Sequence, residues 1–224
     1  MEKEKKNEFI DRLRMISTAV ISDAMDKLGI KAAMSSSIKP IKLGIKLVGP
    51  AVTIKRIKKP MNIGEEDFAQ YAKIMHETID TTEPGDIMVI DADGDIESAT
   101  WGGNMSTAAK AKNLGGAIID GGARDRQEIA EMGFPLFMKS LVPTAGAGRL
   151  VTVGYNIPVV CGNILVHPGD MIMGDDDGVV VIPKSRIEEI LELAEVIEQK
   201  ESKMAEYLRE GHKLMEAIGK FKIK

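Results

Sequence analysis

The sequence predicts an α/β fold, because its central part alternates short apolar segments with segments of helical periodicity. Residues 87–91 and 116–119 are apolar and short enough to be strands, whereas residues 104–113 and 125–132 repeat apolar positions at helical spacing. Glycines stand between these segments, where turns are needed. A chain that repeats strand, turn and helix in this order is typical of a sheet covered by helices.

Further strands are predicted on both sides of this central part. A strand-like stretch at residues 47–54 precedes a helix-like one at residues 65–78. After the central part, glycine and proline turns separate short apolar segments that predict a β-rich layer: residues 135–138, 157–160, 171–173 and 178–182. The Asp177-Gly178 pair is typical of a hairpin turn.

Both ends of the chain are predicted to be helical. Apolar positions recur over residues 7–28, with an interruption near Ser17 and with Ser22 as the cap of a second short helix. Ser185 can cap a long final helix, whose apolar positions run over residues 187–208 with charges on the other face. Such a length suggests that the final helix packs on a neighbouring subunit.

The size and composition are those of one globular domain. Hydrophobic residues make up 44% and charged residues 29% of the 224 residues, which excludes a disordered chain and a membrane protein. We therefore expect a single domain over residues 1–224, with N-terminal helices over residues 1–30 and a C-terminal helix over residues 184–219.

Net charge and cysteine content limit the classes of partner and the cellular compartment that we expect. The net charge of −4, with lysines interleaved among acidic residues, leaves no basic surface, so no nucleic-acid partner is expected. No apolar run reaches the roughly 20 residues that span a bilayer, so no membrane partner is expected. The single cysteine, Cys161, cannot form an intramolecular disulfide, and residues 1–6 have no apolar signal core behind them. Both features favour a cytoplasmic protein.

The first candidate for a ligand site is a glycine turn. Trp101, Gly102 and Gly103 precede the helix predicted at residues 104–113. The free N–H groups of a first helical turn, approached over glycine backbone, can bind a carboxylate. Taken alone, however, a Gly-Gly pair more often only turns a corner.

The second candidate lies where the next predicted strand ends. Gly121 and Gly122 lead from that strand to Arg124 and Asp125 at the start of a helix, where ligands of α/β sheets collect. Arginine offers a planar fork for a carboxylate or an enolate oxygen, and aspartate is a hard oxygen ligand suited to Mg²⁺ or Mn²⁺. An aspartate that favours the helix dipole beside a surface arginine would explain the pair equally well.

The two turns together carry a resemblance to a known family. Twenty residues separate Gly103 from Arg124, and the pattern Gly-X20-Arg-Asp-X2-Glu is completed by Asp125 and Glu128. The chain resembles the family that contains the regulator of ribonuclease E activity A and the metal-dependent 4-hydroxy-4-methyl-2-oxoglutarate aldolases. The similarity covers nearly the whole chain, and further matching segments are residues 18–24, 49–53, 84–86, 168–170 and 175–180.

The resemblance implies a fold, an assembly and an activity. The fold is the swivelling β/β/α domain of the RraA-like type, and the assembly is a homotrimer or a hexamer with the site at a subunit boundary. The activity is that of a class II pyruvate aldolase, a lyase that depends on Mg²⁺ or Mn²⁺. It would split a 4-hydroxy-2-oxo acid into pyruvate and a carbonyl compound, and it could also decarboxylate oxaloacetate.

The resemblance also implies roles for individual residues. Asp125 would ligate the metal, and Arg124 would bind the keto or enolate oxygen of a small 2-oxo acid. The backbone N–H groups of Gly102, Gly103, Asn104 and Met105 would hold the substrate carboxylate. Lys139 matches a position that is often basic near the substrate, and Glu201 is a candidate acid that reaches a neighbouring subunit.

One position departs from the family pattern. Relatives with the aldolase pattern often carry Asp or Glu directly after Trp-Gly, where this chain has Gly103. That acid is expected to hold the water that protonates the enolate, and Asn104 could replace it in part as a hydrogen-bond donor. The alternative function is therefore a non-catalytic regulator that binds an RNA-degrading enzyme.

The remaining titratable residues are assigned to structure. His76, His167 and His212 lack the spacing of a zinc site. Cys161 has no histidine nearby in sequence, so it is predicted to be a buried structural cysteine.

Overall fold

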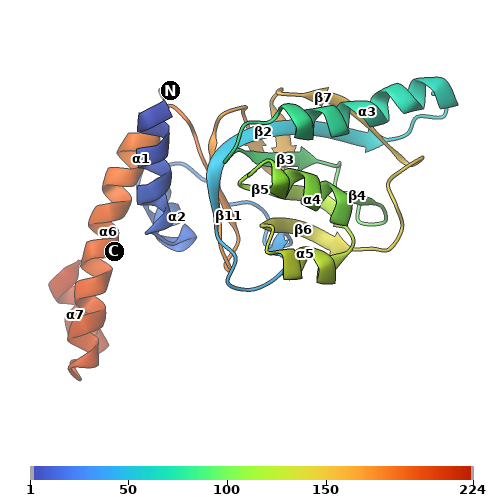
Figure 1. Cartoon of the computed structure of the whole chain (residues 1–224). Helices are drawn as coiled ribbons and strands as arrows, with labels where there is room; N and C mark the ends of the chain where they lie inside the picture. The colour runs from blue at the N-terminus through green and yellow to red at the C-terminus, as the bar shows by residue number, and fades with distance from the viewer. Residues whose placement is uncertain (1–2, 223–224) are drawn as a thin grey trace. The chain divides into compact units, whose positions relative to one another are not determined.

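The computed structural model describes residues 3–222, which form two compact units. One unit contains both ends of the described chain, up to Lys31 and from Ser185 onward. The other contains residues 32–184 and all of the described strands. Figure 1 labels the helices and strands of both units.

Among the described residues, the terminal unit is wholly helical. Its elements are α1 (Lys3–Arg14), α2 (Thr18–Lys27), α6 (Ile187–Arg209) and α7 (Leu214–Phe221). Leu13, Ile21 and Ile190 are fully buried and come from α1, α2 and α6, whose packing forms the core of this unit. Arg12 on α1 donates a hydrogen bond to Glu195 on α6 at 2.8 Å, which lowers the pKa of that carboxyl.

The break between the first two helices lies where it was expected, near Ser17. The residue that caps the second helix differs from the predicted one. Ser17 caps α2, because its hydroxyl accepts the N–H of Val20 at 3.2 Å. Ser22, predicted as the cap, lies inside the helix. The buried side chains of Ile21 and Ala24 on both sides of Ser22 belong to one apolar stripe, whose burial outweighs the capping preference of a serine.

The C-terminal helix predicted over residues 184–219 is in fact two helices. The chain turns between α6 and α7, where Gly211 adopts a φ of +93° that favours glycine. The predicted capping by Ser185 is also wrong. Arg186 is the N-cap residue of α6, and no side chain caps that helix N-terminus.

The second unit contains the strands and the remaining helices. In chain order its elements are β1 (Lys39–Pro40), β2 (Leu47–Lys58), α3 (Glu65–Thr81), β3 (Ile87–Asp91), β4 (Ala99–Trp101), α4 (Gly103–Ala111), β5 (Gly116–Ala123), α5 (Arg126–Met132), β6 (Leu136–Leu141), β7 (Leu150–Tyr155), β8 (Val159–Cys161), β9 (Ile164–Val166), β10 (Met171–Gly174) and β11 (Val179–Ile182).

A nine-stranded sheet is the centre of this unit, in the order β1-β6-β5-β3-β2-β10-β11, with β4 beside β5 and β7 beside β2. Strands β2, β3, β5 and β6 are parallel neighbours, and β4 is parallel to β5. Helices α3, α4 and α5 lie along the same face of the parallel strands (Figure 1), over a core that includes Met88, Trp101 and Phe134. The predicted α/β fold is confirmed.

The strands differ from the prediction in extent and number. Strands β4 and β9 are outside the predicted set, because three residues are too few to show a period. Strand β7 is also additional, and the strand expected at residues 157–160 is β8, which begins only after Pro158 because proline cannot donate to a ladder. The hairpin turn at Asp177-Gly178 is confirmed between β10 and β11.

Strand β2 bends from one part of the sheet into another. Its first four residues pair with β10, and from Ala51 onward it pairs with β3 and later with β7. At this bend a Cβ atom on Gly49 would lie 3.0 Å from Cγ1 of Ile87 and closer still to the carbonyl oxygen of Gly85. Only a residue without a side chain fits there.

We expect Gly49→Ala to destabilise the protein by about 3 kcal/mol or more, because the opposing atom is a backbone oxygen that cannot move aside. Urea denaturation followed by circular dichroism measures the change. Gly64→Ala is the control, since a Cβ there meets no atom within 4 Å, and its cost should stay within about 1 kcal/mol. Equal stability of the Gly49→Ala and Gly64→Ala variants would contradict the packing argument.

Candidate active site

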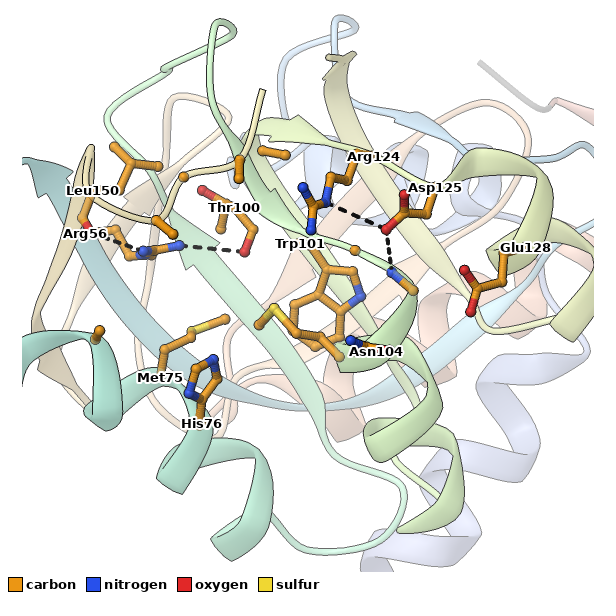
Figure 2. A pocket seen from close by; sticks show the side chains of 18 of the residues that line it. Arg56, Met75, His76, Thr100, Trp101, Asn104, Arg124, Asp125, Glu128 and Leu150 are labelled. Carbon is orange, nitrogen blue, oxygen red and sulfur yellow. Dashed lines mark hydrogen bonds and ion pairs between the residues drawn. The ribbon is translucent and has the colours of Figure 1, made fainter. Parts of the chain in front are cut away.

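Two glycine turns meet at the carboxyl ends of β4 and β5. These strands are parallel neighbours in which Trp101 pairs with Ala123, and the N–H of Arg124 donates to the carbonyl oxygen of Trp101 at 3.0 Å. Because paired parallel strands end at the same level, the residues that follow them lie side by side. The two turns therefore converge as predicted (Figure 2).

Trp101 anchors the first turn. Its indole is buried, stacks on the ring of Phe134 with centroids 5.9 Å apart, and donates from Nε1 to the Ser106 hydroxyl at 2.7 Å. That hydroxyl in turn donates to the carbonyl oxygen of Gly102 at 3.1 Å. The turn is thus held to the first turn of α4 by buried, hydrogen-bonded side chains.

Asp125 is held in an unusual backbone conformation. It is the N-cap residue of α5, with a φ of +63° in the left-handed region, which costs a non-glycine residue conformational energy. Its carboxylate does not cap α5 but accepts the N–H of Gly103 at 2.9 Å, and its Oδ2 lies 3.5 Å from Nε of Arg124. The explanation of Asp125 by the dipole of its own helix therefore does not account for where its side chain points.

The carboxylate of Glu128 stands where a side chain at position 103 would be. A Cβ atom built on Gly103 would lie 2.6 Å from Cδ of Glu128, far inside van der Waals contact. Glu128 comes from the first turn of α5 and reaches across to the start of α4 (Figure 2). The chain therefore has an acid at this place after all, supplied from another element.

Helix α4 begins at Gly103, so its first-turn N–H groups lie beside the carboxylates of Asp125 and Glu128. The N–H of Gly103 already donates to Asp125, so this one of the four predicted N–H groups is engaged within the protein. Those of Gly102, Asn104 and Met105 stay predicted donors to a ligand anion. Gly102 is nevertheless required, because a Cβ there would lie 2.8 Å from Oδ2 of Asp125.

These groups open into a cavity of about 360 Å³. Ala145, Gly146 and Ala147 line one side, in the glycine-rich segment before β7, and the N–H of Gly146 donates to the carbonyl oxygen of Ala99 at 2.9 Å. Met75 and His76 line it from α3 (Figure 2). A volume of this order suits a small molecule rather than a polymer.

Arg56 also lines this cavity, and sequence reasoning gives no sign of it. It lies on β2 and is only 7% exposed. Its guanidinium donates to the carbonyl oxygens of Thr100 at 3.4 Å and of Leu150 at 3.1 Å, and burial lowers its pKa to about 10. Arg56 therefore remains a cation at neutral pH, next to the strand that carries the first turn.

Lys139 lies outside the set of residues that line the cavity. Its ammonium pairs with Asp120, which is the register partner of Asp91, and Asp91 in turn pairs with Lys55 at 2.9 Å. These four side chains form a row across four neighbouring strands, β2, β3, β5 and β6. The carboxylates of Asp91 and Asp120 accept N–H groups of the β8–β9 hairpin, so the row holds that hairpin on the sheet.

Two further predicted residues lie elsewhere in the fold. Glu201 is on α6 in the terminal unit, where burial and the nearby Asp23 raise the pKa of its carboxyl. Cys161 is buried as predicted, and burial together with Asp120 and Asp91 raises its thiol pKa well above the usual range. Such a thiol stays protonated and is unsuited to nucleophilic chemistry.

The oxygen donors around Gly103 fit a small hard cation. Oδ2 of Asp125 and the carboxylate of Glu128 both flank this glycine. Among the side chains that the structure describes, which leave out that of Glu66, no three His, Cys, Asp or Glu gather closely enough to hold a metal by themselves. Mg²⁺ and Mn²⁺ are commonly bound through one or two carboxylates together with waters and substrate oxygens, which matches such a pair.

The fold and this site define a class of protein: an α/β domain in which a helix start, an arginine and two carboxylates line one cavity at the ends of parallel strands. The chain belongs to the RraA-like family (Aldolase/RraA), which it matches over residues 18–181. In no part of the chain that the structure describes is a helix both long and apolar enough to cross a membrane.

Individual relatives agree with this assignment. A Halalkalibacterium halodurans protein provisionally named 4-hydroxy-4-methyl-2-oxoglutarate aldolase is 36% identical over 188 residues, 84% of this chain and 82% of that protein. The Streptomyces coelicolor protein RraAS2, described as an unusual member of the RNase ES inhibitor RraA family, is 31% identical. It has a TM-score of 0.76, over 87% of this chain and 94% of that one.

An uncharacterized Pseudomonas syringae protein is 27% identical, with a TM-score of 0.85 over 94% of this chain and 92% of that one. The RraA-like fold implied by the sequence is thereby confirmed. The family includes proteins named as aldolases and proteins named as inhibitors of an RNA-processing enzyme.

Proposed function

We propose that this protein is a metal-dependent lyase that cleaves a 4-hydroxy-2-oxo acid to pyruvate and a carbonyl compound. The observation that carries the proposal is the carboxylate of Glu128 beside Gly103. The regulator alternative rests on the lack of an acid after Trp-Gly, and Glu128 supplies one at the same place. Asn104 is then not needed as a substitute, and it lacks a titratable proton.

Each group around the cavity has a part in the proposed reaction. The N–H groups of Asn104 and Met105 hold the substrate carboxylate at the start of α4. Arg124 binds the 2-oxo group and stabilises the negative charge that develops on its oxygen as the bond between C3 and C4 breaks. Glu128 accepts the proton of the C4 hydroxyl and returns it to C3 of the enolate, so that protons balance.

Asp125 and Glu128 would hold the divalent cation. When bound, Mg²⁺ or Mn²⁺ supplies Lewis-acid polarisation of the 2-oxo group. The backbone strain at Asp125 and its bond to Gly103 fix the direction of the carboxylate before any ligand arrives. The same polarised 2-oxo group would permit decarboxylation of oxaloacetate.

The direct test is pyruvate release, coupled to lactate dehydrogenase, from 4-hydroxy-4-methyl-2-oxoglutarate and from oxaloacetate, with and without Mg²⁺. We expect release to require the metal and Arg124→Ala to lower it by about 10²- to 10³-fold, the range for losing one oxyanion donor. Free metal decarboxylates oxaloacetate, so enzyme-free blanks are subtracted.

Arg126→Ala is the matched control for this experiment. Arg126 stands two residues away on α5, and its Nε donates to the carbonyl oxygen of Ile41 at 3.1 Å rather than facing the cavity. Its loss should leave release unchanged within a few-fold. No release from either compound by the unaltered protein would overturn the lyase proposal.

A further inference from the structure

Arg56 is a buried cation to which no described side chain brings a counter-charge. Among the side chains that the structure describes, which are those of residues 3–222 other than Glu66, no carboxylate lies at ion-pair distance from it. Its two described hydrogen bonds go to neutral carbonyl oxygens, and its Nε has no partner among these residues. Arginine is almost never buried to this extent unless it is paired, because desolvation of a lone cation is costly. A group that a ligand brings would complete this environment.

The position of Arg56 in the cavity indicates what that group is. In Figure 2 the carboxylates of Asp125 and Glu128 lie on the side of Arg124, and Arg56 lies at the opposite side of the cavity. Thr100 stands next to Arg56, and its hydroxyl is a second buried polar atom without a hydrogen-bond partner among the described residues. A cation beside a free hydroxyl is suited to an anionic oxygen group.

The spacing allows a small molecule with an anion at each end. Arg56 donates to the carbonyl oxygen of Thr100, and Asn104 in the first turn of α4 follows four residues later, so the two are at most about 13 Å apart at an extended rise of about 3.3 Å per residue. The carboxyl carbons of an extended five-carbon diacid are about 5 Å apart, at about 1.5 Å per carbon–carbon bond. Each end then adds a hydrogen bond of about 2.9 Å.

We propose that Arg56 is a specificity-determining residue that binds the distal carboxylate of the substrate, so that the enzyme selects 2-oxo diacids over 2-oxo monoacids. This inference rests on the proposed function, because the lyase site defines which end of the substrate reacts. Arg56 acts on the group that leaves in the carbonyl product and takes no part in breaking the bond.

The test compares two substrates that differ only at the distal end. 4-Hydroxy-4-methyl-2-oxoglutarate carries a carboxylate where 4-hydroxy-4-methyl-2-oxopentanoate carries a methyl group. Cleavage of the first gives two pyruvates and cleavage of the second gives one pyruvate and acetone, so the rates are compared per molecule of substrate cleaved. The measured quantity is the ratio of their kcat/KM values. We expect Arg56→Met to lower this ratio by about 10- to 100-fold, the range for losing hydrogen bonds to a charged group. Arg56→Lys should lower it less, because lysine keeps the charge but loses the planar fork.

Lys58→Met is the matched control. Lys58 lies on the same strand two residues later, its side chain is exposed, and it does not line the cavity. Its loss removes the same charge and should leave the ratio unchanged. Thermal melting followed by circular dichroism shows whether each variant folds. If Arg56→Met does not fold, the comparison is made with Arg56→Lys.

Two results would overturn the proposal: a ratio near one in the unaltered enzyme, or an Arg56→Met variant in which both kcat/KM values fall in proportion. The second result would assign Arg56 to the scaffold. If the unaltered protein cleaves neither compound, the lyase proposal fails. The role of Arg56 in binding a distal carboxylate is then tested separately by ligand affinity. Calorimetric titration with 2-oxoglutarate and 2-oxopentanoate should then show that the diacid binds more tightly by about 10-fold or more, and Arg56→Met should lose this difference. Equal affinity of the unaltered protein for the two compounds would contradict the inference.

Discussion

Asp125→Ala should abolish metal-dependent pyruvate release, with a loss of about 10³-fold or more. The variant removes a hard oxygen ligand and also the acceptor that fixes the N–H of Gly103 at 2.9 Å. Losing one of few ligands weakens metal binding, and losing the acceptor loosens the helix start that would bind the substrate. Activity is measured across a Mg²⁺ titration, so that weakened metal binding appears as a higher half-saturating concentration.

Asp93→Ala is the matched control for Asp125. Asp93 also has a left-handed backbone, with a φ of +59°, and it also pairs with a basic side chain, Lys55 at 3.4 Å. The strain of placing alanine there is therefore comparable, while the metal and substrate groups stay intact. Full metal-dependent activity in Asp125→Ala would remove this residue from the metal site.

Glu128→Gln should lower turnover by about 10²-fold or more, which is the lower range for losing a general acid–base group. The amide keeps the size of the side chain beside Gly103 but cannot exchange a proton at neutral pH. The substrate KM should change much less than kcat. The effect is read from steady-state pyruvate release at saturating Mg²⁺.

The matched control here is Glu131→Gln. Glu131 lies further along α5, is exposed, and accepts a hydrogen bond from Gln127 at 2.9 Å. Its loss should leave turnover unaltered. If Glu128→Gln is as active as Glu131→Gln, the carboxylate beside Gly103 has no part in proton transfer.

Moving the carboxylate from Glu128 to position 103, where the resemblance implies an acid, is a second test of the role of this carboxylate. Gly103→Asp alone should be poorly active, because its Cβ would collide with the Glu128 side chain. Glu128→Ala with Gly103→Asp removes the collision and places the acid on α4. Recovery of turnover in the double variant above either single variant would show that one carboxylate can serve from two elements.

Some of the site residues could be predicted from the sequence, and others could not. Arg124 and Asp125 follow a strand and precede a helix, and this local pattern already points to a ligand site. Glu128 belongs to the same motif, but no local sequence pattern indicates that its carboxylate lies beside Gly103. Arg56 has no local signal at all, because a basic residue within a strand usually faces solvent.

Lys139 shows what sequence spacing cannot assign. The resemblance implies a basic residue near the substrate at this position, which stays a prediction, and in the structure its ammonium pairs with Asp120. Which of two neighbouring acids a lysine meets depends on strand register, and the register of β5 and β6 shifts just after Ile119. A one-residue shift moves side chains to the other face of a sheet, so sequence spacing alone cannot assign this partner.

By itself the sequence determined what depends on local physics: the strand and helix periods of the central part, the glycine turns, the Asp-Gly hairpin, and the arginine–aspartate pair at a strand end. The tertiary structure alone decided which groups share one space. It placed Glu128 in the volume left by Gly103, buried Arg56 with no acid beside it among the described side chains, and ended β4 at the same level as β5. The reason is that such contacts join residues far apart in the chain, whose encounter is set by sheet register and packing rather than by neighbours in sequence.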